Sequence, residues 1–368
     1  MNAKLLRLSL GDGYGGSHTG ALLLTEYSAS RGVETLLVVS EGSLTERRAQ
    51  EKGLRFVAID DDASDRELFD FLKAEIERFA PDLLVAHHSR ERKLSLRLKR
   101  KLGDRFINVA HRHNLSKTAP LVGPFLYNRY CDYHIAVHES VKRSLTDAGI
   151  REERVKVVRN GVPFPDDLDE ISGDDLRREL GLGDAFVVGM SAWFHEKRKG
   201  FDLAMRAFAK LEGDVRLLLL GPDERHRDDL RRLADEAGAD WSRVIAPGFV
   251  RDVWSGYKAM DVFLFPSRSE GFGRSWVEAS AAGVPVVAAN IPPCAENAIH
   301  DGVDGLLVEV ENVEGYVAAI ERIRNDRAFA ERLGGAAQKN AFENFSIERF
   351  GADFMRFLEE ILSEHGVA

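Results

Sequence analysis

Two glutamates in the second half of the chain stand at a spacing that suits the binding of a sugar nucleotide. Glu270 and Glu278 are eight residues apart in the stretch SEGFGRSWVEASAAGVPVVA, and Gly271 and Gly273 closely follow the first of them. Glycines let backbone N–H groups approach a phosphate or a hydroxyl closely. Carboxylates accept hydrogen bonds, so Glu278 suits a ribose diol and Glu270 suits sugar hydroxyls. The spacing alone is equally consistent with no binding role, in which Glu270 is a surface acid and Glu278 an ordinary charged residue of a helix.

The elements that must position these glutamates form a strand-to-helix turn. The pattern predicts a strand over 262–265, a glycine-bearing loop over 266–274, a helix over 275–282 and a strand over 284–289. The start of such a helix presents free N–H groups and the positive end of the helix dipole. Both favour a diphosphate, so the turn predicts a site for a nucleotide diphosphate.

Short apolar runs alternate with helical stretches along the whole chain. The runs are KLLRLSL, VETLLVV, LRFVAI, DLLVA, RFINVA, YHIAV and RVKVV, then AFVVGM, VRLLLLG, RVIA, VFLFP, VPVVAA and GLLV. Parallel strands joined by helical crossovers produce this pattern. A length of 368 residues is long for one core. We therefore expect fold class α/β, with two Rossmann-like parallel-sheet domains facing an interdomain cleft, where ligands bind at the carboxyl ends of the strands.

The stretch RNGVPFPDD predicts the boundary between the domains. Its Asn-Gly pair is a turn signal, and its two prolines stop any regular element. The expected domains are an N-terminal acceptor-binding domain over 1–163 and a C-terminal nucleotide-sugar-binding domain over 164–346. A helix over 347–363 is expected to pack back on the first domain.

Composition and charge exclude several classes of protein. The net charge is −9, with 27 basic and 22 acidic residues up to residue 164 and 24 basic and 38 acidic residues after it. The basic excess of the first half is too small to favour nucleic-acid binding. The first ten residues have no apolar leader segment, no run is long enough to span a membrane, and Cys131 and Cys294 have no metal-ligand spacing. We therefore expect a cytoplasmic protein without a disulfide framework.

The chain resembles the retaining family 4 glycosyltransferases, which have the GT-B fold. The resemblance is strongest in PSRSEGFGRSWVEASAAGVPVVA, which looks like the family's E-x7-E motif, and it continues through NIPPCAENAIHDGVDGLLV. The segments RVKVVRNGV, KGFDLAMRAFAKL, GGSHTGALLLTEYSASRG and YHIAVHESVKRSLTDAGI are also similar to the family pattern. The resemblance implies transfer of a sugar from a nucleotide diphosphate to an acceptor hydroxyl, with the anomeric configuration kept. It implies no metal and no cofactor besides the nucleotide-sugar co-substrate.

The resemblance also implies roles for particular residues. Glu278 would hold the ribose, Glu270 would hold the donor sugar, and Lys199 would neutralise the diphosphate as the bond breaks. The backbone positions that would contact the donor are Gly271, Phe272, Gly273, Arg274, Gly248, Phe249, Val250, Gly15 and Gly16.

Two departures from the family pattern concern the donor site. The family commonly has an arginine six residues before the lysine, where this chain has Trp193, and we take Arg198 as the replacement cation. Before the family's next glutamate, which is Glu296 here, a flexible glycine pair is replaced by Pro292-Pro293. Proline fixes φ and removes a donor, so we expect a stiffer loop and a weaker candidate in Glu296.

Four residues of the first half are candidates for the acceptor side. His111 follows the run that we expect to end at residue 110, and the family often has a histidine near the donor sugar or the acceptor there. We therefore take His111 as a catalytic candidate and His113 as a loop histidine. Ser17 and His18 begin the first helix and are candidates for acceptor binding, although Ser17 also fits as a helix cap and His18 as a structural histidine.

The segment 90–101 is rich in arginine and lysine. Leu94 and Leu98 would face the sheet, which leaves the basic residues on a solvated helix face. The alternative is a peripheral contact with anionic lipid or a lipid-linked acceptor, at the inner face of the membrane.

Three other functions remain as alternatives. Gly11, Gly13 and Gly16 match the G-x-G-x-x-G fingerprint of NAD enzymes, but Glu41 lies 25 residues after Gly16, which is a poor fit for the ribose-binding acid. A sugar-nucleotide epimerase or hydrolase could share the same architecture, and so could a non-catalytic sugar-nucleotide-binding protein. The favoured function is a hexosyltransferase that uses a UDP-sugar, or else a GDP-sugar, to make bacterial polysaccharide, lipopolysaccharide or glycolipid.

Overall fold

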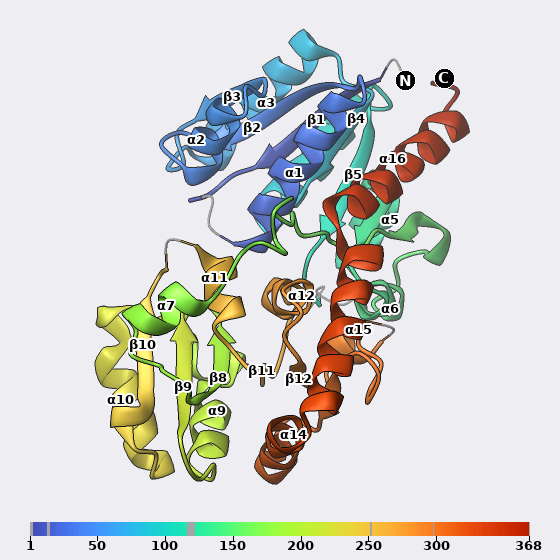
Figure 1. Cartoon of the computed structure of the whole chain (residues 1–368). Coiled ribbons are helices and arrows are strands. Elements are labelled where there is room, and N and C mark those ends of the chain that lie inside the picture. The colour runs from blue at the N-terminus through green and yellow to red at the C-terminus, as the bar shows by residue number, and fades with distance from the viewer. Residues whose placement is uncertain (1–2, 13–14, 116–121, 251, 297, 368) are drawn as a thin grey trace. The chain divides into compact units, whose positions relative to one another are not determined.

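The computed structural model describes residues 3–12, 15–115, 122–250, 252–296 and 298–367 (Figure 1). Gly13 of the glycine-rich loop therefore lies outside the described residues. The chain divides into two compact units. Unit 1 comprises residues 1–161 and 347–368, and unit 2 comprises residues 162–346. The division follows Gly161, two residues before the boundary expected from the prolines.

Unit 1 is built on a sheet of seven parallel strands in the order β3-β2-β1-β4-β5-β6-β7. The strands are β1 (Lys4–Ser9), β2 (Glu34–Ser40), β3 (Phe56–Ile59), β4 (Leu83–Ala86), β5 (Ile107–Arg112), β6 (Tyr133–Ala136) and β7 (Val155–Val157). The helices are α1 (Gly16–Ser30), α2 (Leu44–Glu51), α3 (Asp65–Phe79), α4 (Ser89–Leu102), α5 (Val122–Tyr130), α6 (Glu139–Asp147) and α16 (Ile347–Glu364), with a 3-10 turn at Glu152–Arg154.

Helices cover both faces of this sheet. On one face, α3 and α4 pack Leu72 and Leu94 against Leu6 of β1, which agrees with the expected orientation of the α4 leucines. On the other face, the phenylalanines of α16, among them Phe354, pack with Leu24 of α1 in one cluster. In Figure 1, α16 (red) runs beside α1 (blue), and the two helices are in contact. The end of the chain thus completes the core of the first unit.

Unit 2 is built on a sheet of six parallel strands in the order β10-β9-β8-β11-β12-β13. The strands are β8 (Phe186–Ser191), β9 (Val215–Leu220), β10 (Val244–Gly248), β11 (Val262–Phe265), β12 (Val286–Ala289) and β13 (Leu306–Val308). The helices are α7 (Asp174–Glu179), α8 (Glu196–Lys199), α9 (Phe201–Phe208), α10 (Arg227–Ala237), α11 (Val253–Lys258), α12 (Arg274–Ala281), α13 (Pro292–Ala295), α14 (Val313–Asn325) and α15 (Arg327–Phe345), with 3-10 turns at Glu224–His226 and Trp241–Arg243.

Both sheets have the strand order of a doubly wound fold, which confirms the expected fold class. In such sheets the order reverses at one point, and ligands bind beyond the carboxyl ends of the two strands there. The reversal lies between β1 and β4 in unit 1 and between β8 and β11 in unit 2. The loops that follow these four strands are therefore where binding residues are expected.

The structure corrects the expectation for the start of the first helix. The N-cap of α1 is Gly15, with φ of 106°, and Ser17 is the second residue of the helix rather than its cap. Its hydroxyl hydrogen bonds to a histidine instead of a backbone N–H group. Among the described residues, no helix is both long and apolar enough to cross a membrane.

Candidate functional site

In unit 2, the loops after β8 and β11 bring two of the predicted residues into contact. Lys199, at the end of α8, places its Nζ atom 2.6 Å from Oε1 of Glu270. The side chains are 15% and 7% exposed, so water screens the ion pair only in part. The two residues are 71 positions apart in the chain. The fold therefore assembles one cation and one hydrogen-bond acceptor at the predicted edge of the sheet.

A glycine makes this close approach possible. Gly200 has φ of 73°, and a Cβ atom there would lie 2.1 Å from the carbonyl oxygen of Pro266. The loop after β11 can therefore lie directly against the corner between α8 and α9. The backbone N–H of Arg268 donates to the carbonyl oxygen of Arg198 at 2.9 Å, which ties the two loops together.

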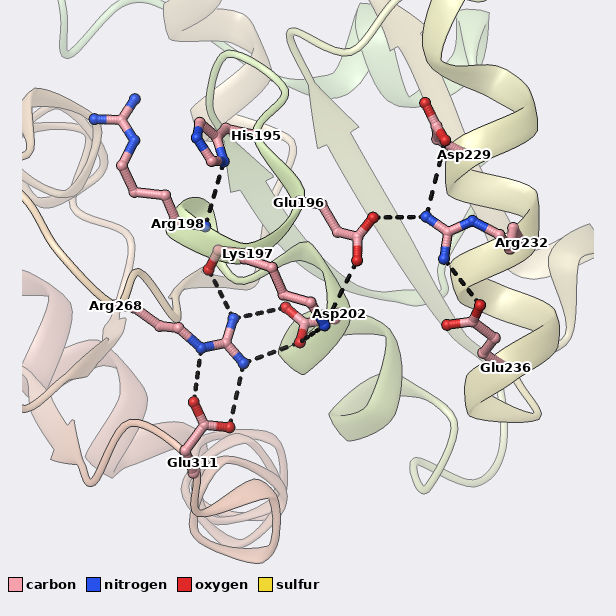
Figure 2. A network of polar contacts seen from close by, with 10 residues as sticks. All are labelled: His195, Glu196, Lys197, Arg198, Asp202, Asp229, Arg232, Glu236, Arg268 and Glu311. Carbon is pink, nitrogen blue, oxygen red and sulfur yellow. Dashed lines mark hydrogen bonds and ion pairs between the residues drawn. The ribbon is translucent and has the colours of Figure 1, made fainter.

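A network of charged side chains joins α8, α9 and the loop after β11 (Figure 2). Arg268 donates to both carboxylate oxygens of Asp202 at 2.8 and 2.9 Å, to Glu311 at 2.6 Å and to the carbonyl oxygen of Lys197 at 2.7 Å. Burial alone would raise the pKa of Asp202, but the hydrogen bonds and charge of Arg268 outweigh it and lower that pKa. Arg268 therefore works as a clamp that holds both loops in place.

Glu278 lies one turn into α12, where two side chains hold its carboxylate. The hydroxyl of Tyr257 donates to Oε2 at 2.7 Å, and Arg274 donates to Oε1 at 3.2 Å. Burial, followed by the charge of Glu278, raises the pKa of Tyr257 well above its usual value. Tyr257 therefore stays a donor at neutral pH and keeps Glu278 oriented. Sequence reasoning missed Tyr257, which carries no motif of its own.

Phe272 and Gly273, in the loop before α12, were both predicted to contact the donor through their backbone. The side chain of Phe272 is buried against Trp276 and Phe345, so only its backbone is available to a ligand. Gly273 has φ of 83°, and a Cβ atom there would lie 2.7 Å from the ring of Phe265. This position therefore requires glycine, which lets α12 begin directly over the sheet.

Two large aromatic side chains are exposed at the same edge of the sheet. Phe249 and Val250 follow Gly248 at the end of β10, and Trp193 follows β8. Trp193 is 55% exposed and Phe249 is 68% exposed, and their ring centroids lie 5.7 Å apart. The residue that replaces the family arginine is thus paired with a residue predicted to flank the nucleotide base.

Other donor-side candidates are less well placed. The side chain of Arg198 is exposed and extends away from the charged network in Figure 2. Pro292 and Pro293 begin the short helix α13, where the missing N–H group of proline costs nothing. Glu296 caps the end of this helix and is half-buried.

In unit 1, the structure reverses the roles expected for two histidines. His111 lies within β5, is fully buried, and neither ring nitrogen has a hydrogen-bond partner among the described residues. His113, which we expected to be an ordinary loop histidine, is the one that lines a pocket of 260 Å³. The strand continues to Arg112, two residues further than expected. Because the strand extends past His111, this side chain is buried within the sheet layer, and His113 is the first residue beyond the carboxyl end of the strand.

The pocket collects polar side chains from three neighbouring strand ends. Ser17 and His88 line it, with Ser17 Oγ 2.9 Å from His88 Nε2. His18 is instead buried and bonds through Nδ1 to Ser9 Oγ at 3.0 Å, and burial lowers its pKa to about 4. Of the two acceptor candidates, Ser17 therefore lines the pocket, whereas His18 is not in its lining and packs against His88, with the ring centroids 4.2 Å apart. His87, another lining residue, was missed by sequence reasoning, although the pair His87-His88 directly follows β4.

Several of the basic residues of α4 are not available to a membrane surface. Arg90 contacts Asp65, Lys99 contacts Asp104 and Asp132, and Arg92 donates to the carbonyl oxygen of His87. The residues left exposed are Lys93, Arg97, Arg100 and Lys101.

Comparisons with known proteins agree with both units. Residues 14–164 match the domain family described as Glycosyltransferase Family 4, and residues 174–340 match the one described as Glycosyl transferases group 1. The chain is 26% identical over 351 residues to the lipopolysaccharide core biosynthesis glycosyltransferase LpsE of Rhizobium meliloti, covering 94% of this chain and 96% of that protein. It is 33% identical over 223 residues to a D-inositol 3-phosphate glycosyltransferase of Geodermatophilus obscurus, covering 56% of this chain and 48% of that protein.

The fold also matches a solved structure along almost its whole length. The structure of Anabaena HepE in complex with UDP-glucose has a TM-score of 0.84 at 21% identity and covers 98% of this chain and 100% of that one. At this identity the likeness shows the fold. Together with the two domain matches and the relatives, it shows that the chain is a glycosyltransferase of the GT-B fold, with a family 4-like domain followed by a group 1 domain.

Proposed function

We propose that this protein is a retaining glycosyltransferase that moves a hexose from a UDP-sugar to an acceptor hydroxyl in the synthesis of lipopolysaccharide or capsular polysaccharide. The observation that carries the proposal is the contact between Lys199 and Glu270, at the carboxyl ends of β8 and β11. Lipopolysaccharide and capsule synthesis appear in the names of two relatives, LpsE and the CapM protein of Staphylococcus aureus.

The arrangement in unit 2 suits each part of a sugar nucleotide. Glu278, oriented by Tyr257, offers carboxylate oxygens to the ribose diol. The exposed rings of Trp193 and Phe249 offer apolar faces to the base. Lys199 offers one positive charge to the diphosphate. UDP is the favoured nucleotide because the structural neighbour HepE was solved with UDP-glucose.

The proposed chemistry breaks the bond between the anomeric carbon and the diphosphate oxygen and forms a bond from the acceptor oxygen to the same carbon. The proton of the acceptor hydroxyl passes to an oxygen of the leaving diphosphate. Lys199 and the backbone N–H groups at the start of α12 stabilise the charge that develops on the diphosphate. Without a donor, Glu270 neutralises Lys199. With a donor, the diphosphate takes over that role, and Glu270 is released to accept hydrogen bonds from the sugar hydroxyls.

Nucleotide binding is the first experiment. Melting temperatures of the full chain are measured with UDP, GDP, ADP, UDP-glucose and NADH, since a ligand that binds only the folded state raises the melting temperature. We expect UDP and UDP-glucose to stabilise most. A shift with NADH alone, or no shift with any nucleotide diphosphate, would contradict the proposal.

Product analysis separates transfer from the alternative chemistries. The chain is incubated with UDP-glucose alone and then with a bacterial membrane extract that supplies acceptors. Transfer predicts a glycosylated product only with acceptor present, in the α configuration if the donor configuration is kept. An epimerase converts the donor without an acceptor, and a non-catalytic binding protein leaves the donor unchanged.

A further inference from the structure

The polar pocket of unit 1 has a hydrogen-bonding pattern that the fold fixes in advance. It lies beyond the carboxyl ends of β4 and β5, next to the start of α1, and its lining includes Ser17, His87, His88, Arg92, Arg112 and His113. The neighbouring Arg7 of β1 is fully buried behind it. These residues decide which chemical groups the pocket can accept.

A chain of hydrogen bonds sets the protonation of two histidines. Nη1 of Arg7 lies 3.1 Å from Nε2 of His87, and Nδ1 of His87 lies 2.8 Å from Nε2 of His113. Arginine can only donate, so Nε2 of His87 accepts and its proton is on Nδ1. That proton is donated to His113, whose own proton must then be on Nδ1. This nitrogen of His113 is buried and has no partner among the described residues.

Both imidazoles are neutral in this arrangement. Burial, followed by the neighbouring histidines and Arg7, lowers the pKa of His87 well below its usual value. Burial also lowers the pKa of His113, to about 3. His113 therefore presents a single N–H donor, in a fixed direction and without a charge of its own.

The permanent charges in the lining of the pocket are positive, those of Arg92 and Arg112. The guanidinium of Arg7 is fully buried, that of Arg112 lies 4.4 Å from the ring centroid of Tyr127, and Arg92 donates to Ser89 Oγ at 3.0 Å. The neighbouring carboxylate, Glu91, is fully buried at the start of α4.

That carboxylate is already satisfied by local donors. Glu91 accepts backbone N–H groups from Leu10 at 2.7 Å, from His87 at 2.7 Å and from His88 at 2.8 Å, and it also lies 2.9 Å from Nδ1 of His88. Glu91 is thus satisfied by backbone N–H groups and His88, and the charged side chains that line the pocket itself are Arg92 and Arg112.

These features argue against a metal ion, although three histidines cluster here. Ring nitrogens of His87, His111 and His113 all lie within 4.8 Å of one another, which is a spacing that a metal could bridge. A metal ligand needs a free lone pair, but one nitrogen of His87 accepts from Arg7 and the other carries the proton that His113 accepts. The nearby arginines would also repel a cation. The donor set therefore fits an anion rather than a cation.

We infer that this pocket binds a phosphoryl group of the acceptor, with the Nδ1–H of His113 as a direct donor and Arg92 and Arg112 as the charge partners. Arg7 and His87 are positioning residues, because they fix the proton of His113. The identification with the acceptor rests on the proposed function, in which unit 2 binds the donor diphosphate. The binding of a phosphoryl group to unit 1 does not depend on it.

The test measures the affinity of the full chain for inorganic phosphate. The line width of the ³¹P NMR signal reports phosphate binding during a titration at constant ionic strength. We expect saturable binding that His113→Phe weakens by about tenfold or more, because the lost hydrogen bond is made to a charged group. Phenylalanine retains a flat ring to stack on His111, whose centroid lies 4.3 Å from that of His113. Arg92→Gln, which removes one of the two positive charges in the lining, is expected to weaken binding several-fold.

A control variant and a competition experiment complete the test. His365→Phe changes a histidine of unit 1 outside the pocket and is expected to leave phosphate affinity unchanged. Saturating UDP is expected to leave phosphate binding intact, because the acceptor phosphate and the donor diphosphate have separate sites. Loss of phosphate binding with UDP would overturn the assignment to the acceptor.

Two further outcomes would overturn the inference as a whole. One is phosphate binding that is absent or is unchanged in both His113→Phe and Arg92→Gln. The other is tight binding of Zn²⁺ that changes the ¹⁵N resonances of His87 and His113 and excludes phosphate. If UDP itself does not bind, the proposed function fails, while the phosphate titration still decides the inference.

Discussion

The two units use the same edge of the same kind of sheet, beyond the carboxyl ends of the strands, for opposite chemistry. In unit 2, the ends of β8 and β11 carry Lys199 and Glu270, a compensated pair of opposite charges. In unit 1, the ends of β4 and β5 lead to neutral histidines backed by arginines. The strand order places both sites, whereas the side chains decide what each can bind. A shared fold therefore says where a ligand sits in each unit and little about which ligand it is.

The electrostatic difference between the sites has a functional meaning. In the proposed mechanism, the carboxylate of Glu270 holds Lys199 until the donor diphosphate takes its place, so the site would exchange one anion for another. The buried Arg7 of unit 1 has, among the described residues, His87 as its hydrogen-bonding partner, and burial lowers its pKa to about 9. It still carries its charge at neutral pH, so unit 1 presents a standing attraction for anions.

The largest expected effect tests the cation of unit 2. Lys199→Ala removes the charge that stabilises the leaving diphosphate, and we expect a loss of transfer rate of about 10²- to 10³-fold, as for the removal of one transition-state donor. The assay is the initial rate of product formation from UDP-glucose. Lys197→Ala is the matched control, since this neighbouring lysine pairs with Asp202 at 3.3 Å and its loss should change the rate less than threefold. Equal effects of the two variants would contradict the assigned role.

The second prediction concerns the ribose contact. Glu278→Gln keeps the size of the side chain but removes its charge and one acceptor, and we expect UDP to bind about tenfold more weakly. Isothermal titration calorimetry measures the affinity. Glu343→Gln on α15 is the control and should leave UDP affinity unchanged. An unaltered affinity in Glu278→Gln would remove Glu278 from the donor site.

The third prediction compares the two units in acid. Folding lowers the pKa of His18 to about 4 and of His113 to about 3, from 6.5, so the unfolded chain binds protons first as the pH falls. The histidine contribution to the stability of unit 1 is thus full above about pH 6.5 and falls by about 1.4 kcal/mol per histidine for each pH unit below it, until the pH reaches the folded pKa of that histidine. In unit 2, the depressed pKa of Asp202, below 3.8, has its effect only in stronger acid.

Hydrogen exchange at pH 7 and pH 5, resolved by peptide, measures this difference after correction for the intrinsic exchange rates. Protection is expected to fall more in β1, β4 and β5 than in β8, β9 and β11. The double variant His18→Gln/His113→Gln should reduce the difference between the units. Equal losses in both sheets would show that the buried histidines do not govern the acid response.

The smallest expected effect concerns the aromatic pair of unit 2. Trp193→Ala removes one apolar face from the proposed base site, and we expect UDP to bind about three- to tenfold more weakly, the usual value of one aromatic contact. Trp241→Ala is the control, because it substitutes a tryptophan at a 3-10 turn of the same unit and is expected to leave UDP affinity unchanged. If Trp193→Ala binds UDP as tightly as the unaltered chain, the base lies elsewhere.

Much of unit 2 was predictable because its signals are local. The strand 262–265 and the loop with its glycines follow from a single stretch of sequence, and the helix begins at Arg274, one residue earlier than expected. The separate roles of Lys199 and Glu270 were implied by the family resemblance, whereas their direct contact was not predicted. The loop geometry that allows it depends on Gly200 meeting Pro266, which no local pattern reveals.

The pocket of unit 1 was harder to predict because it depends on long-range pairing. Arg7 is a charged residue within an apolar run, and its sequence context alone does not indicate burial. Pairing of the strands in the sheet places it beside His87, 80 positions later. We expected β5 to end at residue 110, and it ends at Arg112. For this reason His111 is inside the strand and His113, rather than His111, lines the pocket. A histidine pair directly after a predicted strand, as at His87-His88, is the signal that could have indicated the site.

Unit 2 is proposed to bind the nucleotide sugar through the loops after β8 and β11. Hydrogen exchange of the full chain with and without saturating UDP-glucose tests it most directly. New protection is expected in the backbone of 195–200 and 268–278, with smaller changes in α14 and α15 of the same unit. Protection confined to other segments, or none at concentrations where UDP-glucose raises the melting temperature, would contradict it.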